Sequence, residues 1–288
     1  MEEGQNICKK LHAAALTFAH QNTLPVKFLA RLLRRWYRTI PQDETGRLLW
    51  GKYFRGLAFR LTAWFLGLTI GFTLLYAVVP VPITPLMVVR SWEQAWEAGR
   101  PVRLDNYWVP FGELSPHLQL AVVCGEDQYF LEHDGFDFRA IEKAYSYNQN
   151  HERKRGASTI SQQTAKNVFL WPARSWLRKG FEIYFTFLIE LFWSKERIMT
   201  AYLNVIEFGD GIFGAEAAAQ HFFQKSAKNL NREEAAVLAA VLPNPLEWSP
   251  LKPPRNVRER QQFILSQMRM WGGRLDYDHP NTPKRTEK

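Results

Sequence analysis

The sequence has few cysteines, and their positions exclude one class of fold. Only two of its 288 residues are cysteine, Cys8 and Cys124. The topology described below places Cys8 in the cytoplasm and Cys124 outside, so the two could not pair, and a small disulfide-stabilised secreted fold is excluded. Cys124 lies in an apolar helical stretch, which is more typical of a core residue than of a nucleophile.

A long stretch of the chain also lacks charge. No charged residue occurs between Arg60 and Arg90, and the nineteen residues 61–79 inside this gap are mostly apolar. A run of that length matches a hydrocarbon layer of about 30 Å at about 1.5 Å rise per residue. Lys52 and Arg55 precede the run, so the positive-inside rule places the N-terminus in the cytoplasm and the later residues outside.

Acidic residues are scarce before this run. The first 60 residues hold 11 basic and 4 acidic side chains, whereas the remainder is nearly balanced, with 26 and 24. A basic excess beside a membrane span is a weak indication of nucleic-acid binding, so we predict no nucleic-acid partner. The sequence predicts a basic cytoplasmic extension over 1–60, a transmembrane helix over 61–81, an external domain over 85–272 and a polar tail over 273–288.

The segment 121–135 contains the first candidate site. Ser115 followed by Pro116 is typical of a helix start, so a helix that begins there ends near Glu126 as it leaves the core. A carboxylate at such a junction is partly desolvated, which raises its pKa towards a value useful to a general base. The alternative is a helix end whose Glu126 and Asp127 only solvate a loop.

A second polar segment, 156–166, combines glycine, hydroxyl and amide residues. Ser158 and Thr159 open a helix there, with Lys166 one turn beyond Gln162. A helix start with free backbone N–H groups favours an anion or a sugar. Hydroxyl caps are common, so this signal is moderate by itself.

A third segment places two cations and a carboxylate at the start of an apolar helix. Arg178, Lys179 and Glu182 could clamp a diphosphate and its metal ion, or could be an ordinary charged first turn. Asn204 is offset from the apolar stripe of a later helix, so it is either a local hydrogen-bonding residue or a site residue. A basic helix over about 256–270 is interpreted as structural, and the external part is mainly α-helical.

Together these segments resemble the peptidoglycan glycosyltransferases of glycosyltransferase family 51, in their monofunctional, membrane-anchored form. The matching strings, in the family's order, are E-D-Q-Y-F-L-E-H-D-G at 126–135, G-A-S-T-I-S-Q-Q at 156–163, R-K-G-F-E at 178–182, K-E-R-I at 195–198 leading to Y-L-N at 202–204, and 238–245. The resemblance covers about residues 85–272, and neither the first 50 residues nor the tail. It implies a lysozyme-like, mainly α-helical fold behind a single N-terminal transmembrane helix, with a smaller lobe that dips into the membrane.

The resemblance implies polymerisation of lipid II in the bacterial inner membrane, with the catalytic domain in the periplasm. The donor is the growing glycan chain, α-linked through diphosphate to a polyprenyl carrier. The acceptor is the 4-hydroxyl of the GlcNAc on an incoming lipid II. Inversion gives a β-1,4 strand and releases polyprenyl diphosphate. The implied partners are lipid II, the nascent glycan chain and the inner membrane, together with cell-division or elongation proteins.

The resemblance also assigns roles to residues. Glu126 is the implied base, and Glu182 a second catalytic carboxylate that orients the cations. The implied substrate-binding residues are Asp127, His133, Ser158, Thr159, Gln163, Lys166, Arg178, Lys179 and Asn204. Asp127 and Glu182 are the implied ligands of a divalent cation, Mg²⁺ or Mn²⁺, and no organic cofactor is expected.

Two other functions remain open from the sequence. A lysozyme-like hydrolase or lytic transglycosylase also centres on one glutamate, but uses it as a general acid on an existing strand. Such an enzyme needs no cationic clamp for a diphosphate. A non-catalytic scaffold of the cell-wall machinery would leave the spacing of Glu126, Ser158 and Glu182 unexplained.

Overall fold

The structure is a computed structural model that describes residues 41, 49–97, 99, 101–151, 156–173 and 175–278. Most of the predicted basic extension therefore lies outside the described residues. The described chain forms ten α-helices, two 3-10 helices and three short strands. In chain order these are α3 (Trp50–Val78), α4 (Pro85–Trp96), β1 (Asp105–Asn106), η1 (Phe111–Glu113), α5 (Pro116–Glu126), α6 (Phe138–Asn150), α7 (Ile160–Phe169), α8 (Trp176–Phe192), α9 (Lys195–Val205), β2 (Glu207–Gly209), β3 (Ile212–Phe213), α10 (Ala215–Phe223), η2 (Ala227–Asn229), α11 (Arg232–Val241) and α12 (Arg255–Met270).

Helix α3 is long and apolar enough to cross a membrane. It begins at Trp50 rather than near residue 61, because the segment before the apolar run continues the helix and places its basic residues on the first turns. Inside the apolar run, the hydroxyl of Thr69 donates to the carbonyl of Phe65 at 2.8 Å. Such internal pairing removes the cost of a polar group in lipid. The chain divides into two compact units, Met1–Thr69 and Ile70–Lys288.

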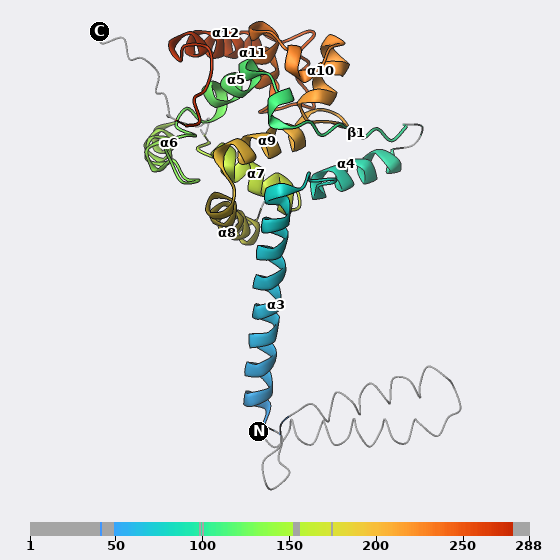
Figure 1. Ribbon diagram of the computed structural model, residues 1–288, viewed down its shortest axis with the longest axis vertical. Coiled ribbons are helices and arrows are strands. Elements are labelled where there is room, and N and C mark those ends of the chain that lie inside the picture. Colours follow the sequence, from blue (N-terminus) through green and yellow to red (C-terminus); the bar gives the residue numbers. More distant parts are fainter. Residues whose placement is uncertain are drawn as a thin grey trace. The chain divides into compact units, whose positions relative to one another are not determined.

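In the second unit, the helices pack as two groups of three. Helices α5, α11 and α12 contact one another, and so do α7, α8 and α9. In Figure 1 the first group lies at the top and the second below it. Helix α11 is rich in buried alanines, which let α5 and α12 approach closely. Burial in α5 raises the pKa of the Cys124 thiol to about 12, as expected for a core cysteine.

Local capping explains several helix starts. Ser115 caps α5 through the backbone N–H of His117, with Pro116 at the first helical position, as the sequence predicted. Asn231 and Glu234 form a capping box at the start of α11. Helix α4 starts at Pro85 because Thr84 provides its cap.

A small three-stranded sheet, in the order β1-β3-β2, closes one side of the core. Strand β1 runs parallel to β3, and β2 runs antiparallel to it. The C-terminal boundary differs from the prediction, because Trp271 and Leu275 are both buried in the core cluster. The packed domain therefore continues into the segment that was predicted to be a polar tail.

We expect Gly214→Ala to destabilise the domain. Gly214 follows β3 with φ of +83°, and an added Cβ would lie 2.7 Å from the backbone oxygen of Asn204. The strained backbone and the close contact should lower the free energy of unfolding by about 1–3 kcal/mol. Thermal unfolding in detergent measures this, with Gly112→Ala as the control because an added Cβ there meets nothing within 4 Å. Equal unfolding temperatures for the two variants would contradict the structure.

Candidate active site

Glu126 is the last residue of α5 and is held by two partners from other helices. Its Oε2 accepts a hydrogen bond of 3.0 Å from the amide of Gln163, and its Oε1 accepts one of 2.6 Å from the guanidinium of Arg260. The Glu126 side chain is only 15% exposed. Burial raises the pKa of the carboxyl, while the charge of Arg260 and the bond from Gln163 act in the opposite direction. This combination suits a general base.

Arg260 is a site residue that the sequence reasoning missed. It lies on α12, and its guanidinium also donates to the carbonyl of Gly125 at 2.9 Å. The interpretation of this helix as merely structural is wrong for Arg260. Nothing in the local pattern around residue 260 distinguishes it from a surface arginine, because its partner is 134 positions away.

Tyr202 fixes the orientation of the Gln163 amide. The hydroxyl of Tyr202, on α9, donates to Oε1 of Gln163 at 3.2 Å, which leaves the amide N–H₂ facing Glu126. Complete burial raises the pKa of Tyr202 well above its usual value, so the phenol keeps its proton and remains a donor. Three helices therefore position one carboxylate.

A cleft of about 650 Å³ is lined by Gln163, the hydrogen-bond partner of this carboxylate, although Glu126 itself is not one of its lining residues. Gln163, Lys166 and Arg178 line it, so Gln163 connects Glu126 with the two cations. Partial burial of the Lys166 ammonium lowers its pKa, with Arg178 and Lys179 adding to the effect and nearby carboxylates opposing it. The Lys166 side chain keeps an exposed face in the cleft. Lys166 and Gln163 both line the cleft. Gln162 is instead buried, where its side chain completes the capping box of α7.

Glu182 binds the two cationic side chains at the start of α8. It is buried, and its two oxygens accept from Arg178 at 2.8 Å and from the ammonium of Lys179. The spacings i,i+3 and i,i+4 on α8 bring the three side chains together. The Nε of Arg178 is buried and has no hydrogen-bond partner within the described structure. The arrangement orients two cations with one carboxylate.

Asp127, His133 and Thr159 join the loop after α5 to the start of α7. The Asp127 carboxylate accepts from His133 Nε2 at 3.0 Å and from the backbone N–H of Ile160 at 2.9 Å. The N–H of Gly135 donates to His133 Nδ1, so the proton of the ring is on Nε2. The Thr159 hydroxyl donates to the carbonyl of Gly135 at 2.6 Å. These side chains position the loop and the helix start.

Ser158 and Asn204 differ in their surroundings. Ser158 is exposed, directly before the start of α7. Asn204 is fully buried, and its amide accepts from the N–H of Val109 at 2.8 Å and donates to the carbonyls of Val109 and Thr200. Its amide hydrogens and oxygen are thus engaged with backbone groups, which favours the local hydrogen-bonding interpretation over a contact with substrate.

The carboxylates do not fit a resident metal site. Among the described residues, no group of three or more histidine, cysteine, aspartate or glutamate side chains comes together to hold a metal ion. The oxygens of Asp127 accept from His133 and Ile160, and those of Glu182 accept from the cations of α8. Hard cations need several free oxygen ligands. The oxygens of Asp127 and Glu182 are therefore committed to donors of the protein itself.

We expect Asn204→Ala to act on stability. Removing the amide takes away the bonds to the half-buried N–H and carbonyl of Val109, and each lost hydrogen bond costs about 0.5–1.5 kcal/mol. Thermal unfolding of the variant should show a lower unfolding temperature than wild type. A variant as stable as wild type that binds substrate less tightly would instead make Asn204 a substrate-binding residue.

Comparison with known proteins finds relatives over the part of the chain that carries these residues. Residues 97–269 match the family model described as transglycosylase. The chain is similar to three curated proteins named biosynthetic peptidoglycan transglycosylase. The one from Bdellovibrio bacteriovorus is 56% identical over 200 residues, which is 69% of this chain and 80% of the relative. The one from Bacteroides thetaiotaomicron is 53% identical over 73% of this chain and 84% of the relative, and the one from Cronobacter sakazakii is 53% identical over 76% and 91%.

These matches cover the segments that carry Glu126, Gln163, Lys166 and Arg178. They confirm the enzyme class and the mainly α-helical fold that the sequence predicted, and they give no support to the lytic or scaffold alternatives. The chain belongs to the transglycosylase family.

Proposed function

We propose that this chain, a peptidoglycan glycosyltransferase of cell-wall synthesis, polymerises lipid II into β-1,4 glycan strands with Glu126 as its base. The observation that carries the proposal is the partly buried Glu126 carboxylate, joined through Gln163 to a cleft that contains Lys166 and Arg178. A desolvated base beside fixed cations suits attack of a hydroxyl on a sugar whose leaving group is a diphosphate.

In the proposed step, Glu126 takes the proton of the acceptor's GlcNAc 4-hydroxyl. The oxygen attacks the anomeric carbon of the donor chain, the bond from that carbon to the phosphate oxygen breaks, and the configuration inverts from α to β. Gln163 and Arg260 hold the carboxylate, so it is positioned before the acceptor arrives.

The leaving group is polyprenyl diphosphate, on which negative charge grows in the transition state. Arg178 and Lys166 line the cleft and would neutralise that charge, while Glu182 orients Arg178 and Lys179. A Mg²⁺ or Mn²⁺ ion would bind together with the diphosphate, because phosphate oxygens and waters are its preferred ligands.

The membrane location is supported by α3 and by α8. Ile183, Phe187 and Leu191 repeat at i, i+4 and i+8 on α8 and are all exposed. The indole N–H of Trp193, at the end of α8, donates to the carbonyl of Thr73 near the end of α3. This supports a single-pass protein whose apolar lobe meets the membrane, and we propose the inner membrane with the catalytic domain in the periplasm.

Polymer formation from purified lipid II in liposomes tests the base. We expect Glu126→Gln to lower the rate by about 10²–10⁴-fold, since general base catalysis contributes about that much. Gel analysis of the glycan products measures the rate, and thermal unfolding shows whether the variant is folded. Polymer at the wild-type rate from folded Glu126→Gln would exclude this base. Cleavage of preformed glycan by wild type, with no polymer, would support the lytic alternative.

The pH dependence tests the partner of the base. Glu126 must be ionised to act, so activity falls as the pH falls through its pKa. Arg260 opposes the upward shift of that pKa, and Arg260→Gln should therefore move the acidic limb of the rate profile to higher pH. Arg260→Lys keeps a positive charge and should move it less. An acidic limb at the same pH in all three proteins would show that Arg260 does not act on Glu126.

A further inference from the structure

Helix α4 carries an apolar ridge on its solvent-facing side. Val88, Trp92 and Trp96 repeat at i, i+4 and i+8, and they are 52%, 64% and 72% exposed. The two indole rings lie against each other with centroids 5.5 Å apart. The opposite side of the helix is held in the domain by Met87 and Gln94, which are buried. Two adjacent exposed tryptophans in one stripe indicate a surface that lipid or another molecule covers.

The chain fixes the start of α4 close to the end of α3. Only six residues separate Val78 from Pro85, which limits their separation to about 24 Å. This connection is itself packed, because Val81 is buried. The guanidinium of Arg197 donates to the carbonyl of Tyr76 at 2.6 Å and so ties the end of α3 to α9. All these residues belong to the same compact unit.

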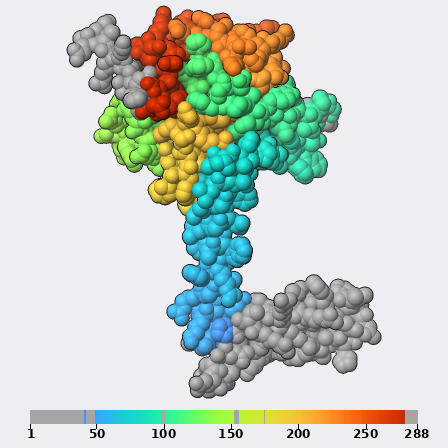
Figure 2. Space-filling view, in the orientation of Figure 1, coloured from blue at the N-terminus to red at the C-terminus, as the bar shows by residue number. Residues whose placement is uncertain are grey.

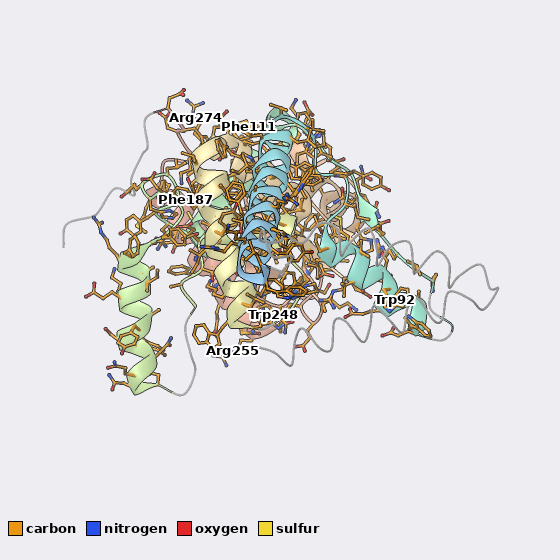
Figure 3. The ribbon with its side chains drawn as sticks, turned by 90° about the horizontal axis from the view of Figure 1, so that it is seen from below. Trp92, Phe111, Phe187, Trp248, Arg255 and Arg274 are labelled. Carbon is orange, nitrogen blue, oxygen red and sulfur yellow. The ribbon has the colours of Figure 1, made fainter. Side chains whose placement is uncertain are left out.

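The direction of α4 suits a membrane surface. It runs sideways from the last turns of α3, residues 70–78, which belong to the same compact unit (Figure 1), and its far end protrudes from the domain (Figure 2). Figure 3 shows Trp92 on this outlying part of the helix. A helix that leaves a membrane span sideways lies along the bilayer face, where tryptophan is enriched because its ring is apolar and its N–H is polar.

The charges of α4 lie off the ridge. Arg90 pairs with Glu93 at 2.7 Å and with the largely buried Glu207 at 3.2 Å. Contact of the ridge with lipid would therefore not bury an unpaired charge. Leu86 and Arg90 of the same helix line the cleft described above. One side of α4 thus forms part of the substrate cleft, while another presents tryptophans.

We propose that the ridge of Val88, Trp92 and Trp96 is a second membrane contact of this domain, seated in the headgroup region of the bilayer. It is separate from the apolar face of α8, and it rests on the proposed membrane location of the enzyme. The spanning helix and the apolar face of α8 leave the domain free to rock about the line that joins them. A second contact through α4 fixes the cleft at a constant height and tilt above the surface in which carrier-linked substrates lie.

Single-cysteine labelling of the full chain tests this proposal. In a background of Cys8→Ser and Cys124→Ala, an environment-sensitive fluorophore is attached to Trp92→Cys or Trp96→Cys. Phe263→Cys on α12, which is 50% exposed, is the matched aqueous control, and Leu68→Cys within α3 is the lipid reference. The proteins are reconstituted into vesicles of phosphatidylethanolamine and phosphatidylglycerol, with brominated lipid or iodide as quenchers.

We expect blue-shifted emission at positions 92 and 96, with loss of fluorescence to brominated lipid and protection from iodide, and the reverse at position 263. Emission at 92 and 96 like that at 263 would overturn the proposal. A blue shift that disappears when the protein is diluted in lipid, without quenching by brominated lipid, would identify a second copy of the chain as the occupant and would also overturn it. Polymer formation by the same vesicles tests the proposed function separately.

Discussion

The partial burial of one carboxylate is the constraint on which the site depends. Glu126 stands where α5 leaves the core, so it loses part of its hydration but keeps a path to the cleft through Gln163. A buried carboxylate without partners would simply take up a proton. Arg260 and Gln163 offset that tendency, and Tyr202 orients Gln163 in turn. The packing of α5, α7, α9 and α12 therefore holds one base in a fixed position.

Each polar motif of the sequence contains residues that serve the site and residues that hold the backbone in place. Only the structure shows which residue does which. In the first string, Glu126 bonds Gln163 and Arg260, whereas Asp127 bonds His133 and the N-terminus of α7. Adjacent residues leave a helix end in different directions, so one carboxylate can serve chemistry while its neighbour joins two elements. The same separation occurs in α7, where Gln162 completes the helix cap and Gln163 bonds the base. Such a motif therefore contains both the side chains that act in the site and the side chains that fix the helix ends around it.

Prediction from sequence succeeded where the relevant interactions are local. The start of α5 at Ser115, its end at Glu126 and the clustering of Arg178, Lys179 and Glu182 all follow from capping and helical spacing. Arg260 could not be found in this way, because its contact with Glu126 depends on how α12 packs against α5. The hydrogen bond between Asn204 and Val109 and the burial of Leu275 in the core also depend on tertiary packing, so the local sequence does not predict them. The start of α3 was misplaced because hydropathy marks the lipid boundary and not the helix boundary.

The charges around the cleft are unbalanced in a way that fits its proposed ligand. Among the residues that line it, Arg90, Lys166 and Arg178 stand against Glu207, and repulsion from Arg178 and Lys179 adds to the desolvation that lowers the pKa of Lys166. A diphosphate anion in the cleft would relieve that repulsion, and it would raise the Lys166 pKa back towards its usual value. The cations would then be held most firmly when negative charge is greatest, which is in the transition state as the diphosphate leaves. The cations repel one another when the cleft holds no diphosphate. Relief of that repulsion would therefore stabilise the transition state more than the free enzyme.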